Sequence, residues 1–328
     1  MAGRPMSSKK STITRAADRV DAIAQEPFHR SGTQPGGGKA GGFVAALIDI
    51  LRHRELLRLL VNRELKQRYK DSSLGFLWTL IRPLVMLAIY YIAIGQFLSA
   101  ARNVPEFAIF VFSGLTIWGL FAEIVSSGTV SILSNGGLIK KVYLPREIFP
   151  VATIGSALFN FAVQFLVLIV GAILLGGIDV NWNLLYIPAA IAVVLIYGLA
   201  LALALSALNV YLRDVQFLVE VGIQIFFWLS PIVYAWAFVV ESVPGWVAQL
   251  YLLNPMTNAV LAFQRAIWSA GSQTVNLGTE DAPIIVGPQP WPGHLELRLL
   301  LIFLVGVVLV WIAHRIFRRL EGNFAQEI

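Results

Sequence analysis

Long uninterrupted apolar runs constrain this chain more than any other feature of its sequence. Residues 148–175, for example, contain no charged side chain. A bilayer core of about 30 Å needs about 20 apolar residues per helix, so this run can cross it. Because 57% of the 328 residues are hydrophobic and only 13% are charged, a soluble core could not use this much apolar surface. The sequence therefore predicts an all-α polytopic membrane protein.

Six such runs predict six transmembrane helices and a domain over residues 76–315. We expect the helices at residues 77–99, 107–128, 148–175, 185–210, 216–239 and 297–315. An even number of spans puts both termini on one side. Of the Lys and Arg residues beyond residue 75, the proposed inner segments 129–147, 211–215 and 316–328 carry Lys140, Lys141, Arg146, Arg213, Arg318 and Arg319. The proposed outer segments carry only Arg102 and Arg265. By the positive-inside rule we expect both termini in the cytoplasm, at the plasma membrane.

The region before the first span divides into two parts. Residues 1–42 are rich in Lys, Arg, Ser, Gly and Pro and predict a disordered basic cytoplasmic tail. The Gly-rich end is no Walker A loop, because Thr33 and Ala40 stand where Gly and Ser or Thr are needed around Lys39. Residues 43–75 have apolar side chains at helical spacing among Arg and Lys, which predicts an amphipathic helix lying in the membrane interface. A soluble helix packed on a partner is the alternative. Fourteen of the 25 Lys and Arg residues lie in residues 1–75 and suit an anionic membrane surface, so we expect no nucleic-acid partner.

Residues 246–270 are moderately apolar but interrupted at Asn254-Pro255 and again at Arg265. A full span is not expected here. We expect two short re-entrant helices at the outer side, because broken helices occur in membranes where protein buries them.

Few residue types in the chain suit catalysis. The chain has no cysteine, and its four His residues are widely separated, so we expect no metal site and no bound cofactor. Glu123 and Glu220 are isolated acids within spans, where a functional role and ordinary solvation near the interface both stay open. A membrane-embedded glycan-synthesis enzyme would need an acidic pair in a loop, and Glu280-Asp281 is the one candidate.

Two residue sets could contact a lipid-linked glycan. Aromatic rings lining a passage could stack on sugar faces, although interface belts and core packing also use such rings. Basic residues around the start of the first span could bind a pyrophosphate head group, although they also suit positive-inside anchoring. The aromatic candidates are Tyr90, Tyr91, Trp118, Phe121, Phe227, Trp228 and Tyr234, and the basic candidates are Arg68, Lys70 and Arg82.

Four stretches in order resemble the ABC-2 type permeases that export lipid-linked polysaccharides such as O-antigen, teichoic acid and galactan. They are LKQRYKDSSLGFLWTLIRPL (65–84), LIKKVYLPREIFPVATIGSALFNF (138–161), LNVYLRDVQFLVEVGIQIFFWLSPIVY (208–234) and LNPMTNAVLAFQRAIW (253–268). The resemblance implies a homodimer that pairs with two copies of a separate ABC ATPase, which binds ATP and Mg. It implies an export subunit without enzymatic activity, moving a polyprenyl-pyrophosphate-linked glycan. An ABC-2 permease for a small drug or lipid stays open.

The resemblance also assigns roles to segments. The helix at residues 47–70 would be a gate helix, and residues 246–270 would form outer gate helices. Residues 135–146 would form a coupling helix that sits in the ATPase. Its candidate contact residues are Asn135, Leu138, Lys140, Lys141, Tyr143 and Arg146.

Overall fold

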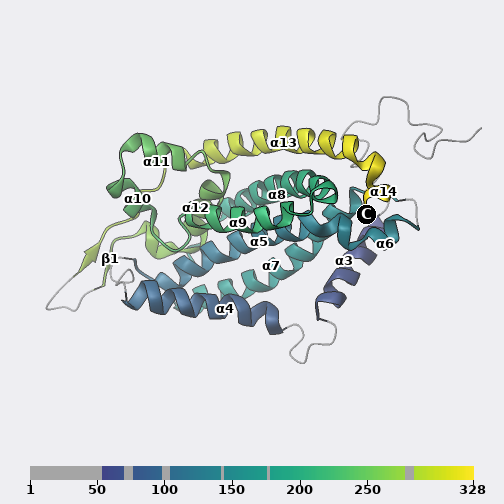
Figure 1. Ribbon diagram of the computed structural model, residues 1–328. Helices are drawn as coiled ribbons and strands as arrows, with labels where there is room; N and C mark the ends of the chain where they lie inside the picture. Colours follow the sequence, from purple (N-terminus) through teal and green to yellow (C-terminus); the bar gives the residue numbers. More distant parts are fainter. Residues whose placement is uncertain (1–53, 70–76, 98–103, 142–143, 176–177, 278–283) are drawn as a thin grey trace, which may run out of the picture. The chain divides into compact units, whose positions relative to one another are not determined.

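The computed structural model describes residues 54–69, 77–97, 104–141, 144–175, 178–277 and 284–328. Within these ranges the regular secondary structure is helical except for two short antiparallel strands, β1 (Val275–Asn276) and β2 (Ile285–Val286) (Figure 1). The predicted tail 1–42 and the pair Glu280-Asp281 lie outside the described residues.

Five helical segments of the described chain are long and apolar enough to cross a membrane. This confirms the all-α polytopic class. The segments are α4 (Trp78–Tyr90) continued by the π-helix η2 (Tyr91–Phe97), α5 (Phe107–Ser134), α7 (Ile148–Leu175), the 3₁₀ turn η4 (Trp182–Leu185) with α8 (Tyr186–Tyr211), and α13 (Leu295–Leu320) with η6 (Glu321–Asn323).

The fifth predicted span is shorter than expected. The helix α9 (Val215–Trp228) has 14 residues and ends before the predicted limit of 239. Pro231 has no backbone N–H to continue the helix, and the Ile232 N–H donates instead to the Ser230 carbonyl at 2.8 Å. A separate short helix, α10 (Trp236–Ser242), follows. The prediction of one continuous helix over 216–239 was therefore wrong.

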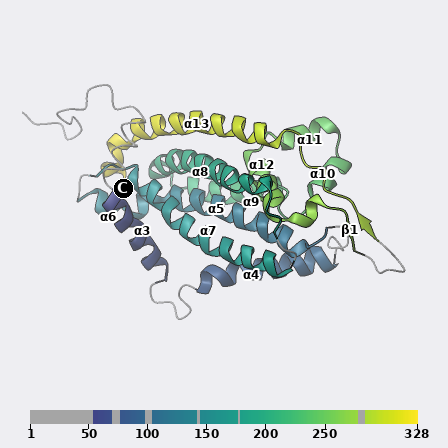
Figure 2. The same ribbon diagram turned by 180° about the vertical axis from the view of Figure 1, so that it is seen from behind.

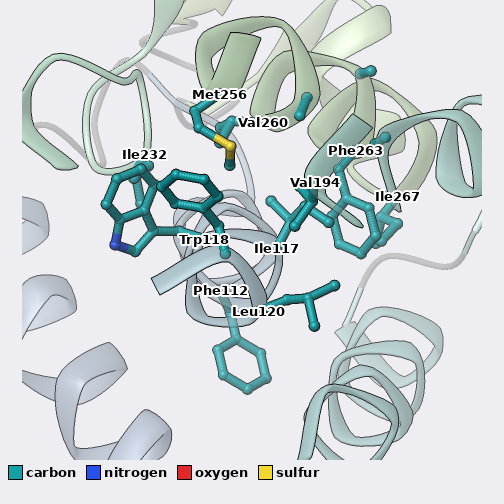
Figure 3. Packing of buried hydrophobic residues seen from close by; sticks show 14 of the residues in the cluster. Phe112, Ile117, Trp118, Leu120, Val194, Ile232, Met256, Val260, Phe263 and Ile267 are labelled. Atoms are coloured by element: carbon teal, nitrogen blue, oxygen red, sulfur yellow. The ribbon is translucent and has the colours of Figure 1, made fainter. Parts of the chain in front are cut away.

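The core of the described chain is built around α5, which packs against α7, α8 and α12. Small residues let α5 and α8 approach closely. A Cβ at Gly128 would lie 2.5 Å from the Ala202 Cβ, and one at Gly198 would lie 2.8 Å from the Ile124 Cγ2. Small residues at helix contacts are the usual means of close packing in membranes. Figure 3 shows the packing of core side chains from these elements, including Phe112, Ile117, Leu120, Val194, Val260 and Phe263.

The predicted break at Asn254-Pro255 separates two short helices, α11 (Gly245–Tyr251) and α12 (Pro255–Ile267). Asn254 accepts a hydrogen bond from the Met256 N–H at 3.0 Å, and Pro255 stands at the start of α12, where its missing N–H costs nothing. Nearly all of α12 is buried against α8 and α5. Protein therefore covers the broken helix, as the prediction required.

The predicted amphipathic helix at 43–75 corresponds to α3 (Arg54–Tyr69), and residues 43–53 and 70–75 lie outside the described residues. It packs against α7. A Cβ at Gly155 of α7 would lie 2.6 Å from the Val61 Cγ2, and the Ser156 hydroxyl donates to Glu64 Oε2 at 2.6 Å. The apolar face of α3 is thus at least partly covered by the chain itself.

Candidate docking segment and transport path

In its described residues, 135–141 and 144–147, the basic segment between α5 and α7 contains a single short helix, α6 (Gly136–Ile139). Its Gly136 and Ile139 are buried, whereas Lys140 and Lys141 are exposed. A Cβ at Gly137 would meet nothing within 4 Å. The segment therefore presents two lysines and an open backbone position at one end of the bundle, next to α14 (Phe324–Glu327) (Figure 1).

Two further predicted coupling residues, Asn135 and Leu138, are half-buried. The Asn135 side-chain amide donates to the Ser131 carbonyl at 2.8 Å, so it stabilises the end of α5 rather than facing outward. Tyr143 lies outside the described residues.

The end of this segment contacts the end of the chain. The Arg146 guanidinium carbon lies 5.7 Å from the centre of the Phe324 ring. Glu147 Oε1 lies 3.5 Å from His314 Nε2, with both side chains buried. Burial alone would raise the pKa of Glu147, but His314, a backbone hydrogen bond at Glu147 and the positive charge of Arg318 together outweigh it, and the pKa is lowered.

Sequence reasoning did not find Glu147, His314 or Phe324. Glu147 follows Arg146 and precedes an apolar run, a place where a solvated acid is ordinary. No local pattern indicates a partner that lies on another helix far along the chain.

The structure brings five of the seven aromatic candidates together. The rings of Tyr90 and Phe227 stack with centroids 6.0 Å apart, and Trp118 lies 5.8 Å from Phe227 and 5.4 Å from Phe121. Trp228 meets Phe227 edge-on at 5.5 Å. Trp118, Phe121 and Phe227 are buried, whereas 49% of Trp228 is exposed. Of this cluster, Trp228 is the ring most open to a passing molecule.

The other two aromatic candidates make different contacts. Tyr91 packs beside Phe107 at 6.4 Å and is 39% exposed. The Tyr234 hydroxyl donates to the Trp228 carbonyl at 2.7 Å, which links the segment after α9 to the last residue of that helix.

One of the three predicted phosphate-binding residues can be placed. Arg82 lies on α4 and is exposed. The side chain of Arg68 and all of Lys70 lie outside the described residues. A joint basic site from these three residues therefore stays a prediction.

The two isolated acids have different surroundings. Glu123 Oε1 accepts a hydrogen bond from the Asn160 side-chain amide at 2.6 Å, between α5 and α7. Glu220 is exposed on α9, one helical turn before the exposed Gln224. Polar groups on a membrane helix face other protein or water rather than lipid, although Phe217, Val221 and Ile225 of the same helix are exposed as well.

Comparison with known proteins identifies the family. The ABC-2 type transporter model matches residues 55–268, a range that includes α6, the aromatic cluster and α12. This chain belongs to the ABC-2 type transporter family.

As an ABC-2 type transporter, the chain is an integral membrane protein and a transport subunit. It is 28% identical over 280 residues to the O-antigen export system permease protein RfbA of Myxococcus xanthus, covering 85% of this chain and 98% of the relative. It is 26% identical over 275 residues to the protein of the same name from Klebsiella pneumoniae, covering 83% of this chain and 94% of the relative. These relatives are named as O-antigen export permeases.

Proposed function

We propose that this chain is the membrane subunit of an ATP-driven exporter of a polyprenyl-pyrophosphate-linked polysaccharide. The observation that carries the proposal is the match to O-antigen export permeases over nearly their whole length. A glycan is too polar to cross lipid, and its polyprenyl tail is too apolar to leave it. The subunit therefore shields the sugars while the tail stays in the bilayer.

Two exposed polar residues of α9 support a passage or a second subunit beside this helix. Glu220 and Gln224 are exposed there, together with the ring of Trp228 at its end. A water-filled passage between two copies of the chain would solvate these groups and place an aromatic face against passing sugars. Trp228 and Tyr91 are the proposed sugar-contacting rings, and Arg82, with Arg68 and Lys70, would receive the pyrophosphate.

A separate ABC ATPase would supply the energy, with ATP and Mg bound on that subunit. Lys140, Lys141 and the open surface at Gly137 are the proposed contact, since they are exposed at one end of the bundle. The transporter would work as a homodimer with two ATPase copies in the plasma membrane, with α6 and both termini facing the cytoplasm.

Depletion of the protein in its host tests the proposal. The carrier-linked glycans are extracted from the inner leaflet and compared with those of undepleted cells. We expect a finished lipid-linked glycan to accumulate. An unchanged pool would point to a small drug or lipid as the substrate, and a smaller pool would point to a role in glycan synthesis.

A further inference from the structure

The basic segment between α5 and α7, which we call the α6 segment, contacts residues 314–328 at three places. The predicted spans give no reason for these contacts. The first contact is the buried pair Glu147 and His314, at 3.5 Å. The second is the Arg146 guanidinium over the Phe324 ring. The third is at Gly136, where a Cβ would lie 2.2 Å from Ile328 Cγ2, so that only glycine leaves room for Ile328 there.

Phe324 joins these contacts to two long helices. Its buried ring lies 5.5 Å from Phe317 of α13 and 6.2 Å from Tyr211, the last residue of α8. The Tyr211 hydroxyl also donates to the Leu320 carbonyl at 2.6 Å. We call Arg146, Glu147, Tyr211, His314, Phe317 and Phe324 the Phe324 cluster. In both views α6 and α14 lie side by side at the same end of the long helices (Figures 1 and 2).

Close packing makes such a cluster a mechanical connection. Packed interiors resist deformation, so a displacement of α6 moves the groups packed against it rather than being absorbed. Lys140 and Lys141, directly after α6, are exposed, whereas Gly136 of α6, which meets Ile328, is buried. A force applied at Lys140 and Lys141 would therefore reach α13 and α8 through these contacts, besides reaching α5 and α7 through the backbone.

We propose that the Phe324 cluster transmits movement of the α6 segment to α13 and α8, which makes Phe324 a positioning residue for export. This inference rests on the proposed function, because it takes α6 as the place where the ATPase acts. It adds a second route, through side-chain packing, to the covalent route along the chain.

The Phe324→Ala variant tests this role against a matched control. Phe161→Ala removes another buried phenyl from the core, where it packs on Phe165 and Phe263 away from the cluster. We expect both variants to copurify with the same amount of ATPase subunit. Phe324→Ala should reduce export about tenfold, which corresponds to a usual coupling free energy. Phe161→Ala, compared at equal membrane abundance, should export normally. Normal export by Phe324→Ala, or loss of the ATPase from it, would overturn the proposal.

A covalent rescue separates transmission from simple folding. The chain has no native cysteine, so Gly136→Cys with Ile328→Cys introduces a unique pair. A Cβ at position 136 would lie 3.7 Å from the Ile328 Cβ, which suits a disulfide. In the Phe324→Ala background, we expect the oxidised pair to export several-fold faster than the reduced pair, with dithiothreitol reversing the gain. Equal export by the oxidised and reduced forms would contradict a mechanical role.

A readout without substrate distinguishes failure of this inference from failure of the proposed function. Arg319 is an exposed residue in the last turn of α13, beyond the predicted span 297–315, and Arg319→Cys provides a single site for maleimide. We expect ATP to change its labelling rate in the complex with the copurified ATPase and expect Phe324→Ala to abolish that change. If depletion leaves the glycan pool unchanged, the polysaccharide proposal fails while this labelling still decides the role of Phe324. A change that persists in Phe324→Ala would overturn the inference.

Discussion

The Asn160 side-chain amide on α7 donates a 2.6 Å hydrogen bond to Glu123 Oε1 on α5. An acid within a membrane helix is costly unless it has partners. We therefore expect Asn160→Leu to lower the free energy of unfolding by about 1–3 kcal/mol, the usual cost of losing a buried hydrogen bond. Glu123→Gln should cost less, because its amide oxygen still accepts. Thermal unfolding in detergent measures the stability of both variants. An equal loss of stability in the two would show that packing, and not the hydrogen bond, causes the effect.

Sequence reasoning located those parts of the fold that depend on local pattern. The long apolar runs predicted six membrane-crossing helices, and five of them are long enough in the described chain because each of those runs continues without a break. The break at Asn254 was predictable because proline and a capping asparagine act on neighbouring residues. The end of α9 at Trp228 was missed, because Ser230 and Pro231 lie within a run whose hydrophobicity continues on both sides.

The candidate site, too, could be predicted only where it depends on local pattern. The basic α6 segment was visible as a charged interruption between two spans. The Glu147–His314 pair was not, because it joins residues on separate helices and only tertiary packing brings them together. Likewise, nothing in the sequence separates the buried Trp118 from the exposed Trp228, since both lie in apolar helical runs.

Gly155 sets how closely α3 can approach α7. A Cβ there would lie 2.6 Å from the Val61 Cγ2, so Gly155→Ile should displace α3 and cost about 1–3 kcal/mol, as overpacking usually does. Val61→Ala should restore part of this loss. Gly171→Ile is the matched control on the same helix, because a Cβ at Gly171 meets nothing within 4 Å. Protease sensitivity of α3 and thermal unfolding report the effect. Equal behaviour of the two glycine variants would mean that α3 does not depend on this contact.

Stability should depend on pH through Glu147. Its carboxyl has a lowered pKa in the folded protein: burial raises the pKa, but His314, a backbone hydrogen bond at Glu147 and the charge of Arg318 together lower it by more. Such a group stabilises the fold above its unfolded pKa of about 4.3, and this contribution is lost as the pH falls through the folded value. We expect the wild type to melt higher than Glu147→Gln near neutral pH, and the difference to shrink below about pH 4.3. Glu241→Gln, at an exposed acid of α10, is the control. A difference independent of pH would show that the charge of Glu147 does not contribute.

Lys140 and Lys141 provide a test of the docking surface. Because both side chains are exposed, Lys140→Glu with Lys141→Glu should leave folding intact. The reversed charges should weaken contact with the ATPase and block export, leaving the lipid-linked glycan inside. Lys66→Glu, at an exposed residue of α3, controls for charge alone. Copurification of the ATPase and the glycan pool are measured together. Normal export from the double variant would show that α6 is not the coupling segment.

We expect alanine substitutions at the two tryptophans of the aromatic cluster to have different effects. Trp118 is 6% exposed and packs on Phe121 and Phe227, so Trp118→Ala should cost about 3–5 kcal/mol of stability, as for other buried aromatic residues. Trp228 is 49% exposed, so Trp228→Ala should be closer to neutral for folding while slowing export if its ring contacts the glycan. Trp228→Phe keeps an aromatic face and should restore most of the rate. Melting temperature and export are compared for all three variants at equal membrane abundance. Export by Trp228→Ala at the wild-type rate would show that sugars pass without stacking on this ring, and the glycan would then have to be guided by polar groups such as Glu220 and Gln224.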